Sequence, residues 1–182
     1  MAFDARLLLE PDVTSGFLTA GVYSRRASEL RREEAVVAVI ERAELKAIGE
    51  RFLAAWQRRD AAALSLNHAP QGVVESPMYA TLRGRKAIEE SYRAFFTSFP
   101  DATMEIENIL ADPPYIVMFA TVNATHQNDF FGLPGTNRHI DFRTARLMKV
   151  NEERLIEHER RIYDFTGLLL QVGLLRAKPA KP

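Results

Sequence analysis

Residues 140–164, "IDFRTARLMKVNEERLIEHERRIYD", decide the fold because they contain two β-strands and the connection between them. Apolar and polar side chains alternate through most of 140–150, which is the period of a β-strand, and residues 155–164 are interpreted as its hairpin partner. The charged segment "NEERL", residues 151–155, has the length of a hairpin connection. This stretch predicts two long antiparallel strands near the end of the chain.

Two more strands are predicted upstream of this pair. Residues 103–112, "TMEIENILAD", alternate in the same way. Residues 115–129 are apolar on both faces as far as Asn123, which is typical of a central strand in a sheet. The Gly- and Pro-rich segment 132–139 predicts the turn into the next strand. Together these segments predict an antiparallel meander.

The first half of the chain has a helical pattern instead. Two helices or one long helix are predicted from Ser24 to about Arg59, and Asp60 is the expected N-cap of a short helix over residues 60–66. The following residues predict a turn at 68–72 and a short strand at 73–79. Two apolar stripes at helical spacing carry these predictions, the first of Leu45, Ile48, Phe52, Leu53 and Trp56, the second of Ile88, Tyr92, Phe95, Phe96 and Phe99.

Helices followed by strands in short hairpins predict an α+β fold in which a curved antiparallel sheet wraps around the N-terminal helices and leaves a pocket between the layers. The expected domain covers residues 44–176. Residues 1–43 are interpreted as an N-terminal arm and helix, and the Pro-rich residues 177–182 as a disordered tail. The run at 165–175 predicts a short helix that packs on the sheet.

Composition excludes several classes of function. The chain has 182 residues, 47% of them hydrophobic, and no net charge, so nothing attracts nucleic acid or an anionic membrane. Cysteine is absent, and the four histidines do not have metal-ligand spacing, so we expect no metal. No phosphate-binding or dinucleotide motif is present, so we expect no cofactor. With no leader or membrane segment recognisable, we expect a cytoplasmic protein.

From about Glu44 to Leu175 the chain resembles the SnoaL-like polyketide cyclase group of the NTF2-like superfamily. The resemblance implies a cone-shaped α+β barrel, usually a homodimer through the outer sheet face, with a deep pocket. Relatives close rings by aldol chemistry, isomerise ketosteroids or open epoxides. The segments that carry the resemblance are "FLAAWQRRDAAAL" (52–64), "GRKAIEESYRAFFTSFPD" (84–101), "ATHQNDFFGLPGTNRHIDF" (124–142) and "RLIEHERRIYDFTGLLLQVG" (154–173).

Two residues are candidate catalytic groups. The resemblance implies that Asp164, at the end of the last long strand, is the acid/base, and an apolar pocket would suit a carboxylate to that work. Asp164 is equally suited to capping the helix that follows, and one residue could do both. His126 ends an apolar strand and either assists a substrate oxygen or serves only the structure.

The last two predicted strands also carry Arg143, Arg146, Arg160 and Arg161, which we interpret first as outward charges paired across strands. Parity places Arg160 with His158 and Asp164, and Arg143 with His139 and Asp141. Outward arginines would pair across strands, whereas an inward arginine would hold a substrate anion. The candidate substrate-binding residues are these two arginines and the aromatic residues near the expected pocket, namely Phe52, Trp56, Tyr79, Phe95, Phe99, Phe131, Arg143 and Arg160.

These features predict a cofactor-free cyclase or isomerase that acts on an apolar, polyketide-like carbonyl compound by general acid/base proton transfer. The alternative is a non-catalytic module that binds a hydrophobic small molecule or supports dimerisation. The direction of the Asp164 carboxylate separates the two hypotheses.

Overall fold

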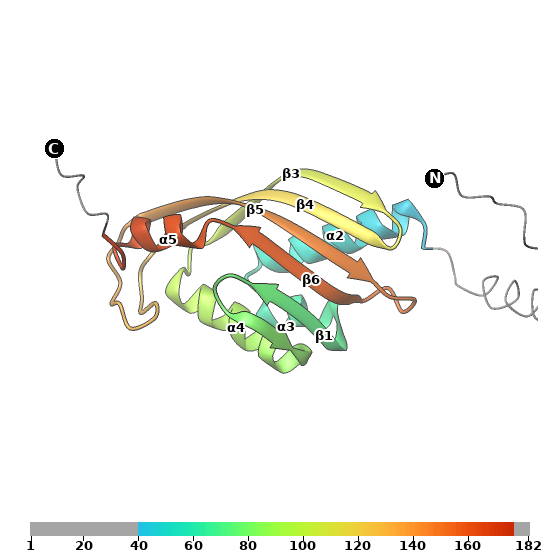
Figure 1. Ribbon diagram of the computed structural model, residues 1–182, viewed down its shortest axis with the longest axis horizontal. Coiled ribbons are helices and arrows are strands. Elements are labelled where there is room, and N and C mark those ends of the chain that lie inside the picture. Colours follow the sequence, from blue (N-terminus) through green and yellow to red (C-terminus); the bar gives the residue numbers. More distant parts are fainter. Residues whose placement is uncertain (1–39, 177–182) are drawn as a thin grey trace, which may run out of the picture. The chain divides into compact units, whose positions relative to one another are not determined.

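The computed structural model describes residues 40–176, which lie in a compact unit that spans Val39–Pro182. The predictions for residues 1–39 and 177–182 lie outside the described residues. Helices precede most of the strands along the chain, as the sequence predicts, and one short helix ends the unit (Figure 1). The helices are α2 (Arg42–Gln57), α3 (Ala61–Leu66), α4 (Gly84–Ser98) and α5 (Phe165–Val172).

Six strands form one curved, open sheet with the order β2-β1-β6-β5-β4-β3. The last four strands are the predicted antiparallel meander, and β4 is flanked by β3 and β5. The first pair of strands joins this meander through a parallel contact between β1 and β6. The strands are β1 (His68–Ser76), β2 (Ala80–Arg83), β3 (Thr103–Asp112), β4 (Tyr115–Thr125), β5 (His139–Val150) and β6 (Ile156–Tyr163).

The predicted apolar stripes of α2 and α4 are buried against the inner face of the sheet. Leu45, Ile48 and Phe52 of α2 are at most 2% exposed, because i, i+3 and i+4 positions share one helix face. Tyr92 and Ile88 of α4 are equally buried. Burial of each large apolar side chain is worth about 1.5–3 kcal/mol, so this packing holds the helices on the sheet.

The caps of the two short helices are alike. The carboxylate of Asp60 accepts a hydrogen bond from the Ala63 backbone N–H (2.9 Å), which confirms the predicted N-cap of α3. Asp164 occupies the same position in α5, where its Oδ1 accepts from the Gly167 N–H (2.7 Å). An N-cap carboxylate satisfies one of the backbone donors that a helix start leaves free.

The predicted turn at residues 68–72 is wrong, because β1 already begins at His68. The pairing of β1 with β6 is irregular between His68 and Val73. Pro70 lies in this stretch and has no backbone N–H to give to a strand ladder, which accounts for the misleading turn signal. The early start of β1 matters for function because it places His68 against β6.

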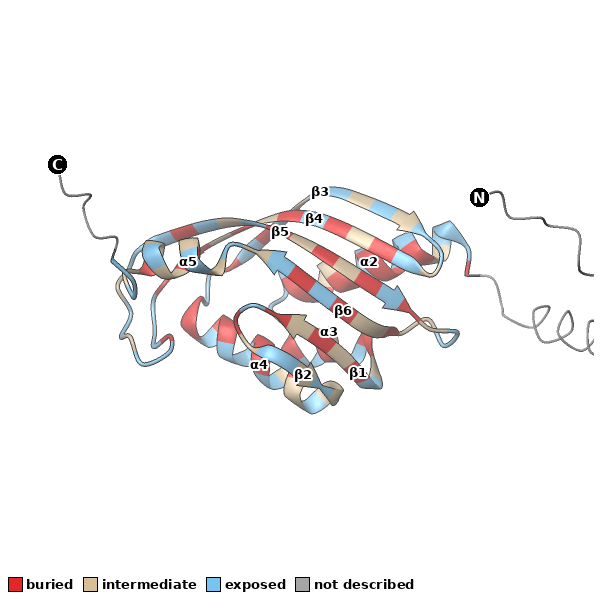
Figure 2. Ribbon diagram, in the orientation of Figure 1, coloured by how far each residue is buried: buried red, intermediate tan, exposed pale blue. Residues whose placement is uncertain are grey.

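The alternation along β5 and β6 separates an inner sheet face, which meets the helices, from an outer one (Figure 2). Thr144, Arg146 and Met148 of β5 are buried and pair with Tyr163, Arg161 and Glu159 of β6. Arg160 lies between the last two and is exposed. Among the described helices, none is long and apolar enough to cross a membrane.

Candidate functional site

A narrow cavity lies between the helices and the inner face of the sheet. Its volume is about 30 Å³, which admits a small polar group rather than a polycycle. Two helices, the β1–β2 turn and the last two strands contribute to its wall. The lining residues are Trp56, Met78, Tyr79, Ser91, Tyr92, Phe95, Phe142, Thr144, Arg146, Arg161 and Tyr163.

Ionisable side chains next to this cavity form a buried ionic cluster, which consists of His68, Tyr92, Arg146, Glu159 and Arg161. Oε1 of Glu159 accepts from Arg146 Nη1 (2.7 Å) and from Arg161 Nε (2.8 Å). Its Oε2 accepts from Arg161 Nη2 (3.2 Å) and contacts His68 Nε2 (2.9 Å). Arg146 and Arg161 are directly opposite in the sheet, where like charges repel, so the carboxylate between them is required.

The guanidinium groups also hold the Tyr92 hydroxyl. Arg161 Nη2 donates to Tyr92 Oη at 2.7 Å and Arg146 Nη1 donates at 3.3 Å. The Arg161 guanidinium lies over the Tyr92 ring at 4.7 Å, and that of Arg146 lies 5.2 Å from both the Phe52 and Trp56 rings. These cation–π contacts add to the hydrogen bonds that orient both arginines.

The surroundings of the cluster determine its protonation. Burial opposes ionisation of Glu159, but the charges of Arg161 and Arg146 and the His68 hydrogen bond outweigh it and hold the pKa of Glu159 well below its usual value. Burial raises the pKa of Tyr92, and it raises the pKa of Tyr79 to about 12. Glu159 is therefore an ionised counter-ion and a poor proton acceptor, while both phenols keep their protons.

Three residues that line the cavity have buried polar atoms without a hydrogen-bond partner among residues 40–176. These atoms are Trp56 Nε1, Thr144 Oγ1 and Arg146 Nε. All three side chains are at most 5% exposed. Two of the atoms can only donate, and a hydroxyl can donate, so the cavity wall is suited to an oxygen acceptor.

Asp164 directly follows Tyr163, the last residue of β6 that lines the cavity, but its own side chain is exposed. The predicted helix cap is present, and a Cβ on Gly167 would collide with the capping carboxylate. The cap uses Oδ1, while Oδ2 has no recorded hydrogen bond within the described part of the chain. The carboxylate thus lies beyond the cavity, in contact with solvent.

His126 is fully buried, outside the wall of the inner cavity. Its Nδ1 is 3.0 Å from Thr136 Oγ1, and the Thr136 hydroxyl donates to the Val172 carbonyl (3.3 Å). Since that hydroxyl has one proton, His126 Nδ1–H is the donor of the first bond. His126 therefore connects β4 to the loop that precedes β5 and, through Thr136, to the end of α5.

The arginines named from the sequence lie on the outer face of the sheet. Arg143 Nε is 3.6 Å from Glu107, and Arg160 Nε donates to Glu75 (2.5 Å). For these two residues the predicted pairing of outward charges across strands is present. For Arg146 and Arg161 it is wrong, because both point inward.

The aromatic candidates divide into three groups. Trp56, Phe95 and Tyr79 line the cavity, as predicted for pocket residues. Phe52 and Phe99 are fully buried in the core beside it. Phe131 is 53% exposed, at a ring-centroid distance of 6.0 Å from Tyr79 and 6.2 Å from Phe165.

The sequence reasoning missed Thr144, Arg146, Glu159 and Arg161 as candidate site residues. Consecutive charges at 159–161 made the two faces of β6 look alike. A usable signal was present in β5, where residues 144, 146 and 148 share the parity of the apolar positions 140 and 142. His68 gave no local signal, because its partner Glu159 is 91 residues away.

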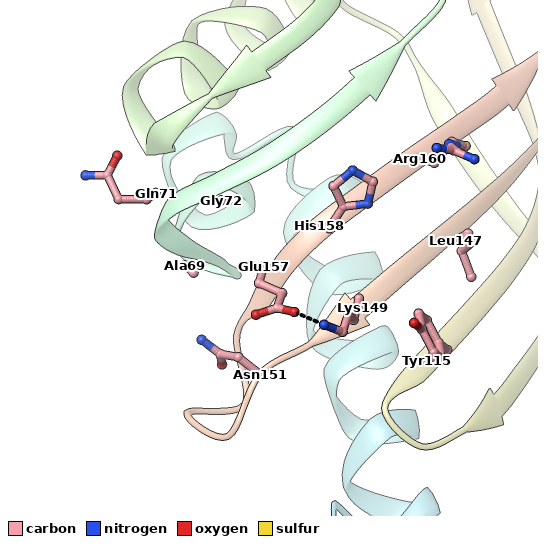
Figure 3. Close-up of a pocket in the computed structure, with 10 residues that line it drawn as sticks. All are labelled: Ala69, Gln71, Gly72, Tyr115, Leu147, Lys149, Asn151, Glu157, His158 and Arg160. Carbon is pink, nitrogen blue, oxygen red and sulfur yellow. Dashed lines mark ion pairs between the residues drawn. The ribbon is translucent and has the colours of Figure 1, made fainter.

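A second, larger hollow of about 690 Å³ lies on the outer face of the sheet (Figure 3). Its charged side chains pair with one another or with neighbours. Lys149 Nζ is 2.6 Å from Glu157, and His158 Nε2 is 3.2 Å from Glu75. Tyr115 and Leu147 form an apolar wall on one side of it. With its charges already paired, this shallow groove is a weaker candidate for chemistry than the inner cavity.

Comparisons with known proteins found one family model that matches this chain and solved structures with the same fold. The family model for SnoaL-like polyketide cyclase matches residues 46–172. AclR from Streptomyces galilaeus, a candidate hydroxylase, superposes with a TM-score of 0.66 at 23% identity over 75% of this chain and 100% of AclR. IdmH from Streptomyces antibioticus, a candidate polyketide cyclase, gives 0.60 at 20% identity over 70% of this chain and 97% of IdmH. No curated protein matches the sequence.

Proposed function

Because the chain belongs to the SnoaL-like polyketide cyclase family, we propose that it is a cofactor-free cyclase or isomerase of an apolar, polyketide-like carbonyl compound. The observation that carries the proposal is a set of donors, on residues of a largely aromatic cavity wall, that have no hydrogen-bond partner among residues 40–176. Such a wall binds a carbonyl oxygen through Trp56 Nε1 and Thr144 Oγ1, while the aromatic rings contact the apolar remainder.

Binding of the oxygen in this way would also promote reaction. When a proton leaves the carbon next to a carbonyl, negative charge develops on the oxygen. Donors and a guanidinium held in place by other contacts stabilise that charge without reorganising, as Arg146 is held by Glu159 and Tyr92. The enolate so formed is the nucleophile of an aldol ring closure, or is reprotonated elsewhere in an isomerisation.

In this proposal Asp164, whose exposed carboxylate lies beyond the cavity next to Tyr163, accepts the proton from a part of the substrate that extends out of the cavity. Glu159 is unsuited to the task because both of its oxygens are held by cationic partners. Asp164 is supported by its place directly after Tyr163 and by its free Oδ2. His126 acts at a distance, by keeping the loop before β5 in place.

The role of Asp164 is testable because asparagine caps a helix as well as aspartate does but cannot take a proton. The assay follows deuterium exchange of the α-protons of 2-tetralone, an apolar enolisable ketone, by NMR in heavy water. We expect the wild-type protein to accelerate exchange over buffer, and Asp164→Asn to lower that rate by about 100-fold. Asp60→Asn is the matched control, since it changes the same cap in α3.

Wild-type exchange in Asp164→Asn would remove Asp164 from the mechanism. The second candidate function is a non-catalytic binding module, which the exposure of Asp164 favours. It predicts no acceleration by the wild-type protein, together with a ligand-induced shift of the indole NMR signal of Trp56. Trp56 is the one tryptophan of the chain and lines the cavity, so this signal reports on binding there.

We further propose that the partner of the outer sheet face is a second copy of the chain. Large apolar residues are exposed there on β3, β4 and β6, with Leu110 57%, Phe119 40% and Ile162 58% exposed, and only β5 lies between β4 and β6. Their pairing positions are close, because Leu110 is opposite Val117 and Ile162 is opposite Ala145, which in turn is opposite Phe119. An apolar patch of this kind is typical of a protein interface.

A further inference from the structure

The charges of the buried ionic cluster do not balance. Arg146, Arg161 and His68 all contact Glu159, and no other carboxylate within residues 40–176 lies within 4.0 Å of any of the three. Arg146 and Arg161 are permanently charged. One carboxylate thus faces two guanidinium groups before the imidazole is considered.

The hydrogen bonds of His68 add a further proton to this count. Its Nδ1 is 3.1 Å from the Leu64 carbonyl, and its Nε2 is 2.9 Å from the Glu159 carboxylate. Both partners are acceptors, so both contacts are satisfied when each ring nitrogen carries a proton. The two guanidinium groups alone outnumber the one carboxylate, so the cluster has an excess of positive charge whichever tautomer His68 adopts.

An excess of buried positive charge is costly unless an anion compensates it. The inner cavity is where such an anion would fit, because Arg146 and Arg161 line it and three of its lining residues have a buried donor, Arg146 Nε, Thr144 Oγ1 or Trp56 Nε1, with no acceptor among residues 40–176. The cavity volume of about 30 Å³ suits a small charged group at one end of a ligand, which we call the head group. Tyr79, Phe142 and Tyr163, all half-buried, surround the head group with aromatic surface.

We infer that the ligand of the inner cavity is an amphipathic anion, with a carboxylate or the enolate of a 1,3-dicarbonyl unit against Arg146, Thr144 and Trp56, and an apolar body toward the mouth. This inference rests on the proposed function and narrows its substrate class from carbonyl compounds in general to acidic ones. Carboxylate and enolate share the chemistry that the cavity recognises, which is an anionic oxygen among fixed donors.

The experiment compares pairs of probes that differ in charge and by one methyl group. The carboxylate arm uses 4-cyclohexylbutanoate and its neutral methyl ester, and the enolate arm uses dimedone, which is ionised at neutral pH, and its neutral O-methyl ether. Binding to the full-length protein is followed by the indole NMR signal of Trp56. We expect at least one anion to bind 10-fold or more tightly than its neutral counterpart, and the arm that shows this identifies the source of the charge.

Thr144→Val tests the location of the anion without disturbing the ionic cluster, because it replaces one hydroxyl by a methyl group of similar size. We expect it to weaken binding of the anion by about 10-fold and to weaken binding of the neutral probe less, because a hydrogen bond to a neutral carbonyl oxygen is weaker than one to an anionic oxygen. Thr121→Val is the matched control, since Thr121 lies on the neighbouring strand β4, and its hydroxyl bonds to Glu107 on the outer face.

Three results would overturn the inference in different ways. If the neutral probes bind as tightly as the anions, the anionic ligand is refuted, while the proposed binding of carbonyl compounds stands. If no probe moves the Trp56 signal, the cavity is not a ligand site, and both the inference and the proposed function fail. Equal loss of anion binding in Thr144→Val and Thr121→Val would refute the location.

Discussion

Substitution of Glu159 by glutamine isolates the electrostatic role of the buried ionic cluster. Glutamine has nearly the same shape as glutamate but lacks the charge that Arg146, Arg161 and His68 share. The variant leaves two guanidinium groups in the core with no carboxylate in contact among the described residues. We expect it to destabilise the fold far more than the loss of a surface ion pair.

The size of the effect follows from burial. Glu159 is 0% exposed, and Arg146 and Arg161 are 5% and 8% exposed. Removal of one partner from a buried ion pair costs about 3–5 kcal/mol, mainly because the other charge remains desolvated. For a domain of this size that corresponds to a fall in Tm of roughly 10–20 °C.

The assay is urea and thermal unfolding followed by the fluorescence of Trp56, at one fixed protein concentration so that any change in association does not contribute. Glu75→Gln is the matched control. Glu75 also bonds to an arginine and a histidine, Arg160 and His158, but on the outer face of the sheet, where water screens the charges. We expect little change in the Tm of this control.

A Glu159→Gln variant as stable as Glu75→Gln would refute the reasoning. It would mean that water reaches the cluster, or that its positive charges are compensated in another way. The inference of an anionic ligand would lose its support from charge balance in the same experiment.

Four further predictions concern pH, capping and association. The pKa of Glu159 is lowered in the folded state. Its contribution to the free energy of unfolding is therefore complete above the ordinary pKa of 4.5 and is lost as the pH falls below that value. The Tm of the wild type should fall in acid more steeply than that of Glu159→Gln. The pKa of Tyr79 is raised from 10.0 to about 12, so its contribution to the free energy of unfolding is complete below pH 10 and is lost toward pH 12. Tyr79→Phe should therefore remove a phenolate step at high pH from the ultraviolet absorbance titration. An unchanged titration would contradict the burial of Tyr79. Gly167→Ala should cost about 1 kcal/mol in urea unfolding, because the new methyl group displaces the Asp164 cap; a neutral result would show that the cap adapts. Ile162→Asp should shift a homodimer toward monomer in analytical ultracentrifugation, and an unaltered sedimentation profile would exclude this part of the outer face from the interface.

Where side-chain burial is periodic along a single element, the sequence sufficed to predict that element. The stripes of α2 and α4 and the alternation in β3 and β5 arise from contacts that repeat every few residues, and these elements form as expected, as does β4, which was predicted from its two apolar faces. The Asp60 cap is local for the same reason. The α+β architecture follows, because helices and strands with one apolar side each can bury it only against one another.

The candidate site was only partly predictable. Trp56, Tyr79 and Phe95 were named in advance because large aromatic residues on the buried faces were expected to line a pocket. The polar residues of the cavity were not named in advance. Arg146 and Arg160 have the same side chain, and only their positions in the strands place one on the inner face and the other on the outer face of the sheet. Asp164 was singled out from family resemblance, and its cap was predictable from the helix that follows.

What the sequence by itself determined is thus the set of elements, their order and the apolar faces that they bury. Only the tertiary structure decided which charged side chains are buried away from water. His68 meets Glu159 because β1 lies parallel to β6, and Arg146 meets Arg161 because of the register between β5 and β6. A side chain's electrostatic role depends on what surrounds it in space, and here those surroundings come from segments up to 91 residues apart.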